Sequence, residues 1–155
     1  MTTPIPSRAT LACLIGAFLA PTALCAQEFK LQAMTLMDGN CRLQAQGGAI
    51  PCKGTVMWTE FKNGRTMLSF FKDNNSYTVS GETTAQPSEG EYRQPIDTIR
   101  YFDGDKLLDA DENAKGACLF NLKANTIKCE VDGHHKKAHY AFELDKVHNI
   151  ERKDF

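Results

Sequence analysis

The sequence predicts an all-β fold, an antiparallel meander of about eight or nine strands that forms a small barrel or a sandwich. Three observations predict it. Short runs rich in β-branched and aromatic residues alternate with tight turns along most of the chain. Two pairs of cysteines, each with ten residues between them, have the spacing of two hairpins. No periodic apolar segment is long enough to form a central helix.

The first 26 residues have the features of a secretory signal peptide. Arg8 supplies the positive charge, and Leu11–Ala20 is an apolar run of ten residues. That run is shorter than the roughly twenty residues that a membrane-spanning helix needs. We expect cleavage between Cys25 and Gln27, which leaves residues 27–155 as a single disulfide-stapled β domain with no transmembrane segment. An uncleaved anchor and a lipid-modified Cys25 are the weaker alternatives.

The four cysteines of the mature chain are expected to form two disulfides. An even number of cysteines in an exported chain predicts a disulfide framework. Folding each interval about its central turn puts Cys41 opposite Cys52 and Cys118 opposite Cys129, and it aligns apolar residues on one face of each hairpin. Zinc binding and redox catalysis are disfavoured because the chain has no Cys-x-x-Cys motif. Pro51 cannot donate to a ladder, so its strand is predicted to be an edge or to carry a bulge.

The other strands follow in order along the chain. Asn63-Gly64 predicts a two-residue turn between strands at 55–61 and 65–72. Further strands, separated by turns, are predicted at residues 77–79, 96–102, 106–108 and 139–147. Two polar segments are predicted as surface loops, Glu82–Gln94 and Asp109–Gly116. The pattern at Gln27–Met37 suits a short helix or an extra strand, and both remain open.

The hairpin around Asn63-Gly64 is apolar on both faces, which is unusual for a sheet with one side in solvent. In the two-residue register, one face carries Val56, Trp58, Met67 and Phe71, and the other carries Met57, Phe61, Leu68 and Phe70. Either other segments cover both faces, or one face is an exposed apolar patch. The second alternative predicts a partner- or ligand-binding surface made of Trp58, Phe61, Leu68 and Phe70.

Composition and missing motifs exclude several classes of function. The formal net charge of -1 disfavours nucleic-acid binding, which needs a clustered positive field. The sequence contains no HExxH or Gly-x-Ser-x-Gly motif, so no catalytic residue and no cofactor are predicted. The leading expectation is a non-enzymatic binding protein, exported to the bacterial periplasm or the extracellular space, that presents its apolar hairpin to a protein partner.

Two alternatives stay open. The first is a carrier of a small ligand or lipid, with a β-barrel cavity lined by Val56, Trp58, Phe71, Phe120 and Ile127. The second is a metal-dependent enzyme in which His135 and His139 combine with a carboxylate of Glu130, Asp132 or Glu143. Because a metal needs three or four converging ligands and His135 follows a predicted turn, no metal ligand is predicted.

Overall fold

The computed structural model describes residues 30–82, 90–135 and 137–155. The predicted signal peptide and the centre of the predicted Glu82–Gln94 loop lie outside these residues. The all-β, antiparallel prediction is confirmed, with eleven strands in one sheet. The strands are β1 (Leu31–Ala45), β2 (Gly48–Ile50), β3 (Thr55–Phe61), β4 (Arg65–Lys72), β5 (Asn75–Glu82), β6 (Glu91–Ile96), β7 (Thr98–Asp103), β8 (Lys106–Asp111), β9 (Lys115–Asn121), β10 (Thr126–Asp132) and β11 (His139–Asp154). The described residues include no helix that is long and apolar enough to cross a membrane.

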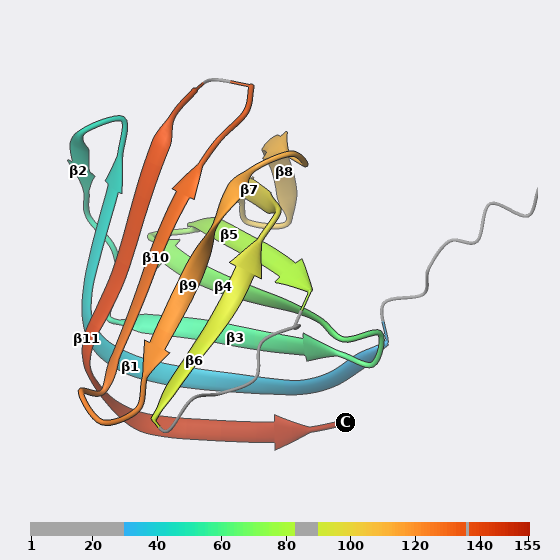
Figure 1. Ribbon diagram of the computed structural model, residues 1–155, viewed down its shortest axis with the longest axis vertical. Coiled ribbons are helices and arrows are strands. Elements are labelled where there is room, and N and C mark those ends of the chain that lie inside the picture. Colours follow the sequence, from blue (N-terminus) through green and yellow to red (C-terminus); the bar gives the residue numbers. More distant parts are fainter. Residues whose placement is uncertain (1–29, 83–89, 136) are drawn as a thin grey trace, which may run out of the picture.

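The sheet folds over on itself into two layers. Its strand order is β6-β9-β10-β11-β1-β3-β4-β5-β7-β8, and β2 pairs with β1 off this path. In Figure 1, strands β6, β9 and β10 run across β3, β4 and β5, while β1 and β11 extend through both groups. The sheet is not closed into a barrel, so the sandwich is the better description of the two that the sequence predicted.

Bulges let β1 and β11 pass from one layer to the other. Their ladder shifts register twice, between Leu36 and Asp38 and between Asp38 and Asn40. On β11, Lys146 and Asn149 adopt positive φ angles of 53° and 46° in the same region. Extra residues in one strand of a pair bend it and increase its twist, which is how strands turn the corner of a sandwich.

The second link between the layers is the short connection from β6 to β7. Strand β6 pairs with β9 in one layer, and β7 pairs with β5 and β8 in the other. At Asp97, between the two strands, the backbone N–H donates to the carbonyl oxygen of Ser80 at 3.0 Å. The chains approach so closely here that a Cβ on Gly81 would lie 1.9 Å from the carbonyl oxygen of Pro95. Only glycine fits at this position.

The core fills the space between the layers. In β1, β9 and β10, for example, alternate residues are buried, as the pleat requires when one face of a strand packs on the core. The largest fully buried apolar side chains are Phe70, Phe142, Leu43, Leu68, Leu144, Val56, Val79 and Val131. The rings of Phe70 and Phe142 come from opposite layers and stack with their centroids 4.9 Å apart. The inner faces are therefore packed directly against each other, with side chains filling the space between them.

Both predicted disulfides are confirmed. Cys118 and Cys129 are directly opposite in the β9–β10 ladder, with a Cα–Cα distance of 3.9 Å. Cys41 and Cys52 are bonded with a Cα–Cα distance of 5.8 Å. Strand β2 ends before Pro51 and pairs only with β1, so it is the edge strand that this proline predicted. Two disulfides are consistent with an oxidising, exported environment.

Several segment predictions need correction. Residues 31–37 belong to β1, so the strand alternative is right for this part of Gln27–Met37. Residues 91–94 form most of β6 although a loop was predicted, because Tyr92 and Gln94 point inward while Glu91 and Arg93 stay exposed. Residues 109–111 and 115–116 of the second predicted loop lie in β8 and β9. In each case, pairing with neighbouring strands outweighs the polar composition of the segment.

Candidate functional site

The β3–β4 hairpin has a register one residue away from the predicted one. Trp58 pairs with Leu68, and Val56 pairs with Phe70. The loop contains three residues, 62–64, and Gly64 adopts a φ of 84° while its N–H donates to the carbonyl oxygen of Phe61 at 3.0 Å. A three-residue loop that ends on a left-handed glycine is the next most common hairpin after the two-residue form. A shift of one residue sends a strand's side chains to the opposite face.

The shift changes which residues share a face with Trp58. Val56, Trp58, Leu68 and Phe70 all point inward, and both Leu68 and Phe70 are 0% exposed. Trp58 is partly buried and packs against the core. Of the four residues predicted to form a binding surface, Leu68 and Phe70 are therefore core residues, and only Phe61 lies on the outer side of the hairpin.

The outer side of this hairpin and of the neighbouring β1 carries a set of half-buried apolar side chains, which we call the methionine face. It consists of partly exposed side chains from β1, β3 and β4, namely Met34, Leu36, Met57, Met67 and Phe71. In the ladders, Leu36 faces Met57, and Met34 and Met67 flank Thr59. The small hydroxyl residues between them are buried: Thr59, Ser69, Thr78 and Ser80. The hydroxyls of Ser69 and Thr78 bond to each other at 3.0 Å, so this pair is satisfied beneath the methionines.

The observed register of the β3–β4 hairpin also changes which residues of the predicted carrier cavity face the interior. Phe71, one of its five predicted lining residues, lies on the outer face. Phe120 and Ile127 do point inward, but they are buried in the packed core, 5% and 3% exposed. At this position the interior is filled by side chains, which is the second of the two outcomes that a small β structure allows.

Among the histidines, His139 lies between two carboxylates. Its Nδ1 is 2.8 Å from Oδ1 of Asp132, and its Nε2 is 2.7 Å from Oε2 of Glu130. The hydrogen bond to Asp132, assisted by Glu130, raises the pKa of the His139 imidazole above its ordinary value. His135 is held elsewhere, its backbone N–H donating to Asp111. Within the described ranges, no three His, Cys, Asp or Glu side chains are grouped to hold a metal ion.

The His139 pair gives a pH-dependent prediction. We expect NMR titration of the imidazole to give a pKa above the usual value of about 6.5, and Asp132→Asn to lower it. Because the folded-state pKa is raised, this pairing stabilises the fold below the unfolded-state pKa, and the contribution is lost as pH rises through the folded pKa. Asp145→Asn, on the same strand, is the control and should leave the titration unchanged. If the pKa of His139 in Asp132→Asn equalled that of the wild type, the pairing would be contradicted.

Ion pairs line a polar pocket formed by β4, β5, β7 and the loops beside them. The pocket has a volume of about 340 Å³. Arg65 binds the Asp97 carboxylate and the hydroxyl of Thr98, while Arg100 binds Glu112 at 2.8 Å. Burial alone would raise the pKa of Asp97, but the hydrogen bonds from Arg65 and Thr98 outweigh it and lower this pKa. Asp97 is therefore ionised at neutral pH and suited to an ion pair, with no tendency to act as a general acid.

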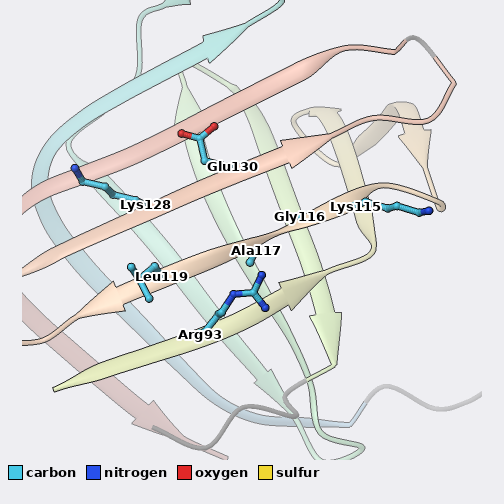
Figure 2. Close-up of a pocket in the computed structure, with 7 residues that line it drawn as sticks. All are labelled: Arg93, Lys115, Gly116, Ala117, Leu119, Lys128 and Glu130. Carbon is cyan, nitrogen blue, oxygen red and sulfur yellow. The ribbon is translucent and has the colours of Figure 1, made fainter. Parts of the chain in front are cut away.

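A second surface pocket lies on the outer side of β6, β9 and β10 (Figure 2). It is a shallow groove of about 580 Å³ lined by Arg93, Lys115, Gly116, Ala117, Leu119, Lys128 and Glu130. Arg93, Leu119 and Lys128 are neighbours across the ladder, and Leu119 is 38% exposed between the two cations. Lys128 pairs with Glu143 at 3.2 Å, and Glu130 pairs with His139. The groove contains no nucleophile activated by a neighbouring base.

The described part of the chain thus carries the methionine face, an ion-paired pocket and a shallow groove. The residues of the methionine face were assigned wrongly from the sequence, because the Asn-Gly pair fits more than one loop length. The groove of Arg93, Leu119 and Lys128 was missed because the segment that supplies Arg93 was predicted to be a loop and forms β6 instead. Comparisons with protein-family models, with curated proteins and with solved structures find no match to this chain.

Proposed function

We propose that this protein is an exported, non-enzymatic binding protein that holds a protein partner on its methionine face. The observation that carries the proposal is the second apolar side of the β3–β4 hairpin. One side of the hairpin supplies the core, as any two-layer fold requires, so the apolar character of the other side has no role in that core. A contiguous, partly exposed apolar patch on such a sheet is typical of an interaction surface.

The composition of the patch suits a protein partner. Methionine has three rotatable bonds and a polarisable sulfur, so it adapts to irregular apolar surfaces. The charged residues beside the patch have both signs. In the β1–β11 ladder, Lys153 faces Met34 and Glu151 faces Leu36. An apolar centre with a mixed-charge rim is the usual anatomy of a protein interface, whereas an anionic membrane would favour a rim of one positive sign.

The compartment also supports this proposal. The signal-like residues 1–26 and the two disulfides fit a chain that folds outside the reducing cytoplasm. A rigid sheet pinned by disulfides presents a binding surface with little loss of entropy on association. We therefore expect the partner to be another protein of the periplasm or the extracellular space.

The test changes the patch without touching the core. Met57→Glu combined with Met67→Glu should leave the fold intact, because both side chains point outward. It should weaken binding by about 30-fold or more if these positions are interface hot spots. Lys128→Glu, on the outer side of the other layer, is the matched control. A partner is captured from the native compartment and purified, and its affinity for the three proteins is measured by calorimetry.

Two results would overturn the proposal. One is equal affinity of the captured partner for the wild-type protein and the Met57/Met67 variant. The other is capture of the same proteins by both, which would mean that retention does not depend on the methionine face. In either case the thermal midpoint of the variant must match the wild type, so that lost folding is not mistaken for lost binding.

A further inference from the structure

Strand β8 ends the sheet with one open edge. It is the last strand in the sheet order, and among the described strands it pairs with β7 alone. In Figure 1 it lies at the periphery of the molecule. In an antiparallel strand, alternate residues point their N–H and C=O groups away from a single partner. An edge of this kind is a template on which another chain can add a strand.

Two leucines are exposed on this edge strand. Leu107 and Leu108 are each 48% exposed, and Lys106 and Asp109 on either side of them are exposed as well. The register of the β7–β8 ladder shifts at this point, so that Leu108 has no cross-strand partner in it. A strand added to β8 would remove both leucine side chains from water, which is a favourable change.

Strand β6, at the opposite end of the sheet order, is less open to a further strand. Pro95 lies within β6 and has no N–H to donate to a neighbouring chain. The carbonyl oxygen of Pro95 also lies against Gly81 of β5, on the approach to the crossover. The two ends of the sheet are therefore not equivalent, and β8 is the end that accepts a strand more readily.

The charge around β8 selects the kind of chain that fits there. Residues 103–112 contain five acidic residues and a single cation, Lys106. Arg100 compensates Glu112 at 2.8 Å, and the other carboxylates still outnumber Lys106. Pairing β8 with the β8 of a second copy would bring two acidic segments together, and like charges on facing strands are destabilising. A segment rich in lysine or arginine is attracted instead.

We propose that β8 binds an extended, basic segment of a partner protein, which is added to the sheet as a further antiparallel strand. The partner's backbone completes the ladder, its apolar side chains cover Leu107 and Leu108, and its cations lie beside the carboxylates of residues 103–111. The site is a strand edge and not the methionine face, so it holds whether or not that face binds a protein. The Met57→Glu/Met67→Glu variant is expected to leave it unchanged.

The probe is a synthetic peptide of alternating lysine and valine, matched in length to β8 and titrated into the disulfide-oxidised protein. We expect saturable binding, with slower amide hydrogen exchange in β8 and unchanged exchange in β6. Replacing the lysines of the peptide by glutamate should weaken binding about tenfold or more, because the charges then repel. N-methylation of alternate residues of the lysine peptide should do the same, because it removes the N–H donors that pair with β8.

A matched pair of protein variants tests the role of charge. Asp105→Asn/Asp109→Asn removes two exposed charges beside the edge, and it should weaken binding of the lysine peptide about threefold or more. It should also reduce the dependence of this affinity on salt concentration. Asp145→Asn/Glu151→Gln makes the same change of charge on β11 and should bind the peptide as the wild type does.

Several results would overturn the proposal. Failure of the lysine peptide to bind would show that β8 does not accept such a strand. Equal affinity for the glutamate peptide would remove the selection by charge, and equal affinity for the N-methylated peptide would exclude backbone pairing. Protection of β6 amides instead of β8 amides would place the added strand at the other end. A concentration-dependent dimer with protected β8 amides, seen without peptide, would make a second copy the occupant.

Discussion

Phe70→Ala is expected to lower the free energy of unfolding by about 3–5 kcal/mol, the range for truncation of a buried phenylalanine. Phe70 is 0% exposed and stacks on Phe142 of the facing layer, so the substitution opens a cavity between the layers. Phe71→Ala should cost less than about 1.5 kcal/mol, because Phe71 points outward and is partly exposed. Two adjacent phenylalanines thus report on opposite faces of one strand.

This comparison tests the hairpin register directly. Both variants are unfolded in guanidinium chloride with their disulfides oxidised, and the midpoints and slopes are compared with those of the wild type. A two-residue turn at Asn63-Gly64 would put the two side chains on the reverse faces relative to Trp58. Equal losses, or a larger loss in Phe71→Ala, would therefore contradict the three-residue loop.

Replacing the Cys118–Cys129 disulfide with two alanines is expected to cost about 3–5 kcal/mol. Each disulfide closes a loop with a sequence separation of 11, which is worth about 3 kcal/mol in the chain-entropy model. Cys118 and Cys129 are also buried in the core, 0% and 1% exposed, so their removal adds the cost of a cavity. Cys41 and Cys52 are only partly buried, so this second term is smaller for them.

The matched control is the Cys41→Ala/Cys52→Ala variant, since the two loops have the same length. Thermal unfolding is measured for both double variants and for the intact protein. The loss of loop-closure entropy is the same in the two variants, so the difference in their stability reports the burial of the cysteine side chains. A loss for Cys41→Ala/Cys52→Ala equal to or larger than that for Cys118→Ala/Cys129→Ala would show that burial does not set the difference.

The disulfides were predictable because two independent signals agree. The cysteine spacing and the turn residues at each midpoint both specify one register, and that register also aligns Leu43 with Ile50 and Phe120 with Ile127, as the structure has them. The β3–β4 hairpin had only the turn as its signal. Asn-Gly is compatible with loops of two and three residues, and the glycine adopts a positive φ in both, so this pair of residues does not choose between them.

Strand β6 was not predictable for a different reason. The inward-facing residues of β6 include Tyr92 and Gln94, so its alternation does not appear as apolar against polar. Tyr92 and Gln94 contact Trp58 and the carbonyl oxygen of Thr66, which lie in β3 and β4, far from β6 in the sequence. Only the crossover from β6 to β7 brings them together, and no local pattern encodes which strand will cover which.

The two long strands β1 and β11 have a consequence for cooperativity. Because each contributes to both layers, neither layer has a complete hydrogen-bond ladder of its own. Pulling the layers apart would require β1 and β11 to straighten at their bulges and leave one layer without its central strands. We therefore expect the two layers to unfold together in one cooperative transition, despite the two-layered shape.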